Sequence, residues 1–179
     1  MGKQYTAINE KLADFIIHQQ MFFVATATAD GRINLSPKGM DSLHIAGPNQ
    51  VVWLNLTGSG NETAAHLLEN DRMTLMFCSF TDESKILRLY GHAKIFHPDS
   101  PVWDEHIVHF PVLSGARQIV VMDVDLLQTS CGFGVPLFDY RGDRGQLQEW
   151  AKKKGEDGIK AYWKERNSIS LDGKPTDLE

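Results

Sequence analysis

The residues best suited to hold an anion lie at a Gly-Ser-Gly turn, 58-GSG-60, between a β-like run and the helix-like segment 61-NETAAHLLEN-70. Backbone N–H groups at a helix start are unpaired and carry the positive end of the helix dipole, so this turn can cradle a phosphate. The same residues also fit a simple cap, in which Ser59, Asn61 or Thr63 closes the helix start. Taken alone, the sequence of the turn favours the helix-capping role over a phosphate site.

Basic residues elsewhere in the chain strengthen the anion hypothesis. The segment 32–39 carries Arg32, Ser36 and Lys38, and Arg88 lies inside an apolar strand-like run. An unpaired charge buried in a protein costs several kcal/mol, so a cation in such a strand reaches water, is paired, or faces a polar ligand. Each residue alone fits a solvated strand position, but together with the turn they would form an anion pocket.

Other reactive side chains give no catalytic assignment. His106 and His109 form an HxxH pair without the third and fourth ligands that a metal site needs, so no metal is expected. Cys78 and Cys131 lack CxxC spacing and are expected to be buried free thiols. No catalytic triad or carboxylate pair is readable, because such partners meet in space rather than in sequence. The catalytic residues therefore stay unknown at this stage.

The elements that would position these residues are mainly strands. Runs rich in β-branched and aromatic residues, separated by Gly, Pro, Asp or Asn, predict six or seven strands. Asp30-Gly31 predicts a tight hairpin between the first two. Short connections and few helices favour a mostly antiparallel sheet closed into a barrel over a parallel βαβ fold. The predicted strands are 21–28, about 32–38, 43–47, 50–56, 72–80, 86–96 and 118–130.

Helical periodicity marks the segments outside the barrel. The predicted helices are 8–19, 61–70, one within 101–110, and the charged segment 144–167, which Gly155 and Gly158 break into two pieces. The polar tail 168–179 is expected to be mobile or docked on a partner. The segment 129–144 fits either a wall of a ligand pocket or a structural loop that closes a dimer.

The length and the net charge of the chain limit the classes of protein to which it can belong. A chain of 179 residues predicts a single domain, 1–179, with the barrel over 21–138. The net charge of −5 and pI near 5.8 provide no basic field for nucleic acid or an anionic membrane surface. Without a signal-like apolar core or a run of about 20 apolar residues, a cytoplasmic location is expected.

The order of these segments resembles the pyridoxamine 5'-phosphate oxidase-like family of FMN-binding split barrels. The resemblance runs from about Phe15 to Phe138. It depends on an N-terminal helix followed by 22-FFVATATADGRINLSPKGMD-41, 52-VWLNLTGSGNETAAHLLEN-70 and 86-ILRLYGHAKIF-96. It implies a six-stranded split β-barrel that dimerises, with two FMN sites across the subunit interface.

The resemblance also implies roles for particular residues. Lys38 matches the flavin-phosphate lysine, and Ser36 lies beside it. Arg88 matches a position that is often basic in relatives. Two further groups match, the tripeptide that lies beside the flavin (Trp53, Leu54 and Asn55) and the turn and helix start that hold the phosphate (Ser59, Asn61 and Thr63).

Departures from the family pattern limit the activity that is expected. The arginine that precedes the lysine by five residues in the authentic oxidases is Ile33 here, and Asn61 and Glu62 replace basic residues after the turn. The end of the chain, 163–179, does not reproduce the Arg- and Trp-containing substrate segment. An FMN-dependent oxidoreductase acting on a small-molecule substrate or electron donor, other than pyridoxamine phosphate, is expected. The alternative is a non-catalytic protein that binds or senses flavin, haem or a deazaflavin.

Overall fold

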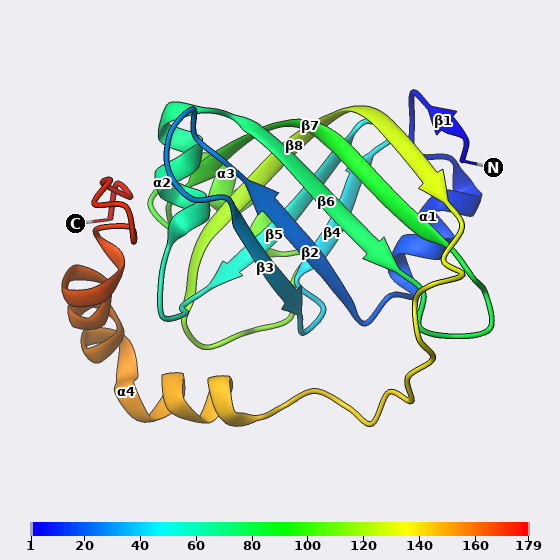
Figure 1. The fold of residues 1–179 in the computed structure, drawn as a ribbon. Helices are drawn as coiled ribbons and strands as arrows, with labels where there is room; N and C mark the ends of the chain where they lie inside the picture. The colour runs from blue at the N-terminus through cyan, green and yellow to red at the C-terminus, as the bar shows by residue number, and fades with distance from the viewer. Residues whose placement is uncertain (1, 179) are drawn as a thin grey trace.

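The fold is a curled sheet of eight strands, seen in a computed structural model that describes residues 2–178 (Figure 1). Every strand pairing is antiparallel. The strands are β1 (Gln4–Tyr5), β2 (Met21–Thr26), β3 (Asn34–Gly39), β4 (Leu43–Gly47), β5 (Gln50–Leu56), β6 (Arg72–Cys78), β7 (Ile86–Phe96) and β8 (Ala116–Ser130). The predicted mostly β, antiparallel architecture is therefore confirmed, with the short β1 as an additional strand.

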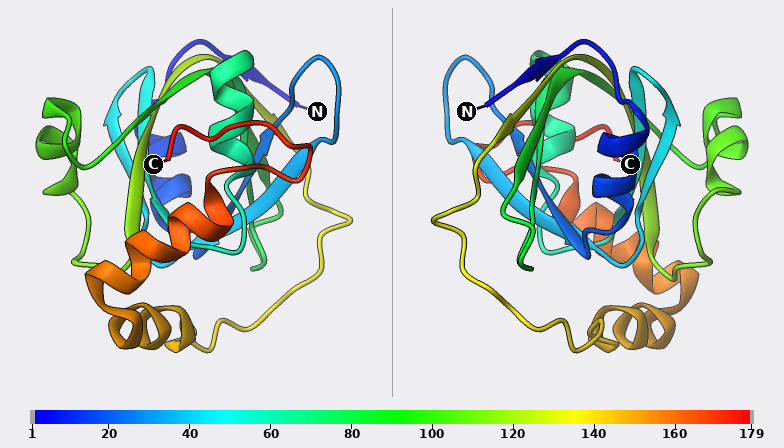
Figure 2. Two further views of the ribbon diagram at one scale, coloured as in Figure 1. Left: turned by 90° about the vertical axis from the view of Figure 1, so that its left-hand side faces the viewer. Right: turned by 90° about the vertical axis from the view of Figure 1, so that its right-hand side faces the viewer.

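The strand order explains why the barrel is split. The sheet runs β3-β2-β6-β7-β8-β5-β4, and β1 adds to β8. Its two edge strands, β3 and β4, are consecutive in the sequence but make no strand pairing with each other. The sheet curls until these edges approach one another, as the end-on views show (Figure 2). The result is a split β-barrel.

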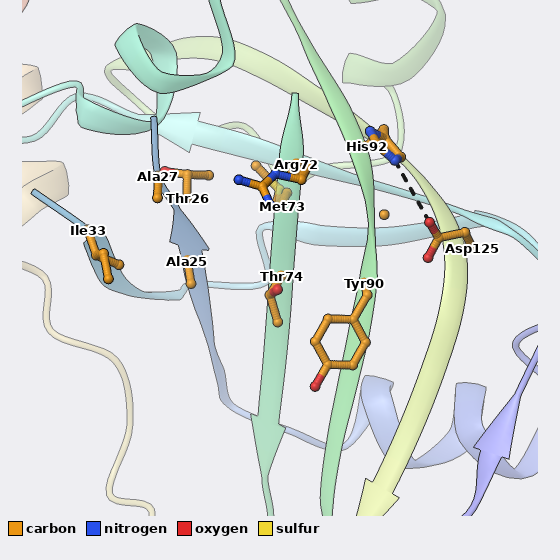
Figure 3. A pocket seen from close by; sticks show the side chains of 11 residues that line it. Ala25, Thr26, Ala27, Ile33, Arg72, Met73, Thr74, Tyr90, His92 and Asp125 are labelled. Atoms are coloured by element: carbon orange, nitrogen blue, oxygen red, sulfur yellow. Dashed lines mark ion pairs between the residues drawn. The ribbon is translucent and has the colours of Figure 1, made fainter. Parts of the chain in front are cut away.

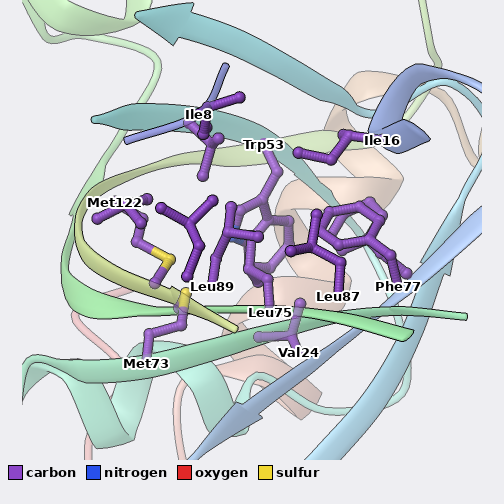
Figure 4. Packing of buried hydrophobic residues seen from close by; sticks show 14 of the residues in the cluster. Ile8, Ile16, Val24, Trp53, Met73, Leu75, Phe77, Leu87, Leu89 and Met122 are labelled. Carbon is purple, nitrogen blue, oxygen red and sulfur yellow. The ribbon is translucent and has the colours of Figure 1, made fainter. Parts of the chain in front are cut away.

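The barrel interior is apolar along most of its length. Alternate residues of β2, β6 and β7 are buried, as the two-residue period of a strand requires. Trp53, Phe22 and Phe77 form an aromatic centre, with ring centroids 6.3 Å apart for Phe22 and Trp53 and 5.8 Å apart for Phe22 and Phe77. Aliphatic side chains such as Leu75 and Leu89 pack around it (Figure 4).

Within residues 2–178, four α-helices surround the barrel: α1 (Glu10–Ile17), α2 (Glu62–Glu69), α3 (Pro101–Ile107) and α4 (Gln146–Tyr162). The helices α1 and α2 lie at opposite ends of the barrel (Figure 1). The helix α3 packs outside β5 and β8, where Phe110 and Trp103 contact Leu54 and its neighbours. The helix α4 is kinked at Gly155, whose φ is +67°, as the predicted break required. A π-helical turn, Trp163–Asn167, continues it.

The structure corrects three local predictions. Asp30-Gly31 does not make a tight hairpin, because pairing between β2 and β3 stops at Thr26 and Asn34 and leaves a longer loop. Backbone and side chain of Arg32 in this loop bond to the Asp172 carboxylate of the C-terminal tail. Cys131 is exposed rather than buried, since it follows the last residue of β8, whereas Cys78 is buried as expected.

The C-terminal tail is the third correction. It was expected to be mobile or docked on a partner, but its described part packs on the barrel of the same chain. Ser170 and Thr176 are buried there, as is Asn167 just before the tail. Lys174 Nζ donates to Glu69 Oε1 of α2 at 2.7 Å. The tail is therefore attached to the barrel, although Ile169 and Leu171 stay exposed.

Across residues 2–178, no helix combines the length and the apolar character that crossing a bilayer requires.

Candidate functional site

A polar pocket of about 420 Å³ opens at the α2 end of the barrel, where β3 approaches β5 and β8. It contains the Gly-Ser-Gly turn and the first residues of α2. The pocket is lined by Asn34, Ser36, Lys38, Asn55, Gly58, Ser59, Gly60, Asn61, Glu62, Thr63, Arg117 and Leu171. The interior of the barrel is therefore apolar at its centre and polar at this end.

Strand register places the β3 side chains in the pocket. Phe22 and Val24, both buried in the core, pair with Lys38 and Ser36 across the β2–β3 ladder. Directly opposed residues of an antiparallel pair share a face, so Lys38 and Ser36 point to the inside of the barrel. Leu35, the residue before Ser36, points to the outer face and is 63% exposed.

Lys38 is a cation without a carboxylate partner among residues 2–178. Its Nζ lies over the Trp53 ring, 5.1 Å from the ring centroid, a favourable but neutral neighbour. Removal from water, followed by the charge of Arg117, lowers the pKa of Lys38 to about 8. The ammonium is therefore still charged at neutral pH but poorly compensated.

Arg117 is the second cation of the pocket, and a β-bulge orients it. The β5–β8 register pairs Asn55 with Gln118 but Leu56 with Ala116, which leaves Arg117 as an extra residue on β8. The side chain is only 2% exposed. One nitrogen, Nη1, donates to Gly60 O at 3.1 Å and to Asn167 Oδ1 at 2.7 Å. Burial lowers its pKa to about 10.

Several buried donors around the pocket have no protein acceptor. Asn55 Nδ2 donates to Gln118 Oε1 at 3.1 Å and to Asn61 Oδ1 at 3.4 Å. However, Asn61 Nδ2 and Arg117 Nε find no partner among the described residues. Buried polar groups are nearly always hydrogen-bonded in proteins, so such orphaned donors call for an explanation.

The start of α2 is also uncapped. Asn61 occupies the N-cap position, but its side chain makes no capping hydrogen bond. The simple capping role considered for this turn is therefore not what Asn61 does. Glu62 also lines the pocket, and both of its carboxylate oxygens accept from the backbone N–H of Leu171 at 3.1 Å. The pocket thus combines two cations, orphaned N–H donors and a helix start, a donor set that fits a phosphate group.

The structure brings together six of the nine residues predicted to bind the cofactor. Ser36, Lys38, Asn55, Ser59, Asn61 and Thr63 all line the pocket. Trp53 lies in the core beneath Lys38, and Leu54 faces the opposite side of β5, toward α3.

Arg88 is not among the residues that line this pocket. It alternates with the core residues Leu87 and Leu89 and so lies on the outer face of β7. Its Nη1 donates to Ser130 Oγ at 3.1 Å.

Sequence analysis missed Arg117, the most buried charged side chain of the site. The predicted strand began one residue later, at Gln118, so Arg117 was assigned to a connection. A basic residue directly before a long apolar strand was the available signal. The bulge that turns it inward has no marker in the sequence.

A second pocket, of about 380 Å³, lies on the outer face of β2, β6 and β7, where Ala25, Thr74 and Tyr90 point away from the core (Figure 3). Its charged side chains, Arg72, His92 and Asp125, are exposed to solvent. Arg72 Nε donates to Asn70 Oδ1 at 3.2 Å. His92 is 2.8 Å from Asp71, and this hydrogen bond raises the pKa of the imidazole. The outer pocket therefore lacks the buried cations of the inner one, because the Arg72 guanidinium is exposed to water.

His106 in α3 and His109 just after it contact aromatic rings. The rings of His106 and His109 are 6.3 Å apart, and His109 stacks on His44 at 4.1 Å. Within residues 2–178, no three His, Cys, Asp or Glu side chains lie where they could share a metal ion.

Comparisons with known proteins show the family of the chain. The pyridoxamine 5'-phosphate oxidase family model matches residues 8–131. The chain is 36% identical over 191 residues to the pyridoxamine 5'-phosphate oxidase family protein ustO of Aspergillus flavus, covering 96% of this chain and 76% of that protein.

Solved structures resemble the fold at low sequence identity. A variant of HupZ from Group A Streptococcus superposes with a TM-score of 0.56 at 17% identity, covering 69% of this chain and 99% of that one. A FAD-binding protein from Mesorhizobium loti gives 0.52 at 11% identity, covering 72% and 97%. These likenesses show the fold, whereas the family model and the 36% identical relative establish that the chain belongs to the pyridoxamine 5'-phosphate oxidase family.

Proposed function

We propose that this protein binds FMN, with the flavin phosphate held in the polar pocket between β3, α2 and β8. The observation that carries the proposal is the pair of cations, Lys38 and Arg117, that face one pocket without a carboxylate partner among the described residues. A phosphate dianion would compensate both charges. The pocket also supplies the uncapped helix start that phosphates favour.

The other donors of the pocket fit the same ligand. Ser36, Ser59 and Thr63 present hydroxyl groups, and Asn61 presents the free Nδ2. Phosphate oxygens accept several hydrogen bonds at once, so a mixture of charged, hydroxyl and backbone donors suits them. Asn55 also lines the pocket and is proposed to lie beside the flavin. The Trp53 ring contacts Lys38 and would hold its ammonium group in position.

We further propose that the protein is an FMN-dependent oxidoreductase. Bound FMN would supply hydride transfer to or from a small-molecule substrate or electron donor. The residues of the chain would bind and orient the cofactor and keep water from its phosphate. Pyridoxamine phosphate is not the proposed substrate, since Ile33 replaces the family's arginine and is 78% exposed.

A homodimer with FMN at the interface is proposed as the assembly. The edge strand β3 supports it, because Ile33 in the preceding loop and Leu35 in the strand expose large apolar side chains next to the pocket. Arg88, on the outer face of the sheet, is proposed to reach the cofactor of a second copy rather than that of its own chain. The size distribution of the purified protein with and without FMN tests this assembly.

The experiment that tests the proposed function is an absorption spectrum after incubation with excess FMN and removal of free ligand. About one flavin per chain is expected, with bleaching by NAD(P)H or another donor if the protein is a reductase. Bound flavin that no donor reduces would favour a binding or sensing role. A colourless protein would refute FMN binding, and the same procedure with haem and a deazaflavin would then test the remaining alternatives.

A further inference from the structure

One side chain of the C-terminal segment, Asn167, reaches both the second cation and the Gly-Ser-Gly turn. Asn167 has no exposed surface. Its Oδ1 accepts from Arg117 Nη1 at 2.7 Å, and its Nδ2 donates to Gly58 O at 3.1 Å. The guanidinium and the turn are therefore held in one fixed arrangement by a residue that follows Arg117 by 50 positions and Gly58 by 109.

The chemistry of this contact leaves the charge of Arg117 available. Buried arginines are usually paired with a carboxylate, which orients and neutralises them at once. An amide oxygen orients the guanidinium without neutralising it. Because Nε of Arg117 is buried and has no partner among residues 2–178, both the charge and a donor remain for a ligand.

The segment that carries Asn167 is firmly attached to the pocket rim. Trp163 Nε1 donates to Thr57 Oγ1 at 2.7 Å, on the residue before the turn. Leu171 lines the pocket and donates its N–H to Glu62. Thr176 Oγ1 donates back to the carbonyl of Asn167. The segment 163–178 is thus one wall of the pocket, although the family match ends at residue 131.

We propose that Asn167 is a positioning residue that presents Arg117 as an uncompensated cation, so that the C-terminal segment 163–178 selects ligands that carry a phosphate. This inference rests on the proposed function for the identity of the ligand. Since the same contacts anchor the segment, a phosphate bound to Arg117 and the packed segment stabilise one another.

The test compares FMN with riboflavin, which differs only by lacking the phosphate. Asn167→Asp keeps an acceptor for Arg117 but neutralises its charge and loses the donor to Gly58. We expect FMN affinity to fall about tenfold or more, the scale of a charge-assisted hydrogen bond, while riboflavin affinity changes less than about twofold. Lys164→Gln, in the same helical turn on an exposed side chain, changes the net charge equally and serves as the control. It should leave both affinities unchanged.

A second variant separates the loss of the Arg117 charge from a folding defect caused by Asn167→Asp. Arg117→Gln removes the charge directly and should show the same phosphate-specific loss. Equal loss of FMN and riboflavin in both variants would show a purely structural role and overturn the inference.

Failure of the proposed function is recognised separately, when the unmodified protein binds neither flavin. Inorganic phosphate then replaces FMN as the probe. Phosphate should raise the thermal midpoint of the unmodified protein but not that of Asn167→Asp. An equal rise in both proteins, or no rise in either, would overturn the role of Asn167.

Discussion

Lys38 and Arg117 reach the same pocket from β3 and β8, two strands that make no hydrogen bonds to each other. Removal from water, and then the charge of Arg117, hold the pKa of Lys38 near 8, well below its ordinary value of 10.5. The two cations therefore repel each other in the protein alone. An anion between them would relieve this repulsion.

The affinity for FMN should decrease as the pH rises above about 8, because Lys38 loses its proton there. Riboflavin, without a phosphate, should show no such decrease. Fluorescence titration of both flavins between pH 7 and pH 9.5 measures the difference. Lys38→Arg keeps its charge through this range, so an equally steep decrease in that variant would assign the pH dependence to another group.

The free energy of unfolding should also respond to Lys38. Because its pKa is lowered in the folded state, the unfolded chain binds more protons between about pH 8 and pH 10.5. The contribution of Lys38 to stability therefore increases with pH across this window and is lost as the pH falls through 8. Urea unfolding of the unmodified protein and Lys38→Met, compared across the window, measures it; parallel pH profiles would contradict the lowered pKa.

Removal of the Lys38 ammonium should weaken FMN binding by about 1.5–3 kcal/mol, the value of a hydrogen bond to a charged group. Arg88→Ala provides an informative comparison, since Arg88 contacts Ser130 on the outer face of the sheet. Isothermal titration with the protein held as a monomer should show a loss for Lys38→Ala only. A comparable loss for Arg88→Ala that appears only in a dimer would place Arg88 at the cofactor of the second copy.

Thr57→Val should loosen the C-terminal segment. The Thr57 hydroxyl accepts from Trp163 Nε1 and donates to Gly115 O, each at 2.7 Å, and the residue is buried. Leaving these partners unsatisfied should cost about 1–3 kcal/mol. Limited trypsin digestion should then cleave within 152–166 sooner than in the unmodified protein. Thr74→Val, on the outer face of the sheet, is the isosteric control, and equal digestion of both variants would contradict the anchoring role.

Gly91→Ala should destabilise the sheet itself. A Cβ at Gly91 would lie 1.9 Å from Asp123 O, in the backbone of the neighbouring strand, at the point where the β7–β8 register shifts. Because backbone must move to relieve this contact, we expect a loss of about 3 kcal/mol or more in urea unfolding. Gly47→Ala has nothing within 4 Å of the added carbon and should change stability by less than about 0.5 kcal/mol.

The sequence predicted the barrel well because its strands depend on local patterns. Buried strands such as β5 and β6 show β-branched and apolar runs between turn residues, and the kink at Gly155 follows from a conformation that glycine tolerates. The loop after β2 was mispredicted, because the Asp30-Gly31 signal competes with contacts from Asp172 that come from the far end of the chain.

Only the part of the site that depends on short stretches of sequence could be predicted. Lys38 and the turn from Ser59 to Thr63 follow from strand alternation and a helix start. Arg117 and Asn167 could not be placed, since one depends on a bulge and the other on packing of a tail across the barrel. Both features are tertiary, and neither has a local pattern in the sequence.

The split between the edge strands has a mechanical consequence for the ligand. Along the sheet, β3 and β8 are separated by β2, β6 and β7. The two strands are therefore connected by hydrogen bonds only through these three intervening strands. A phosphate that bonds both Lys38 and Arg117 would link β3 directly to β8 across the split in the barrel. Occupancy of the pocket would then stiffen the whole cylinder, and amide exchange would slow at the β3 edge as well as at the residues that touch the ligand.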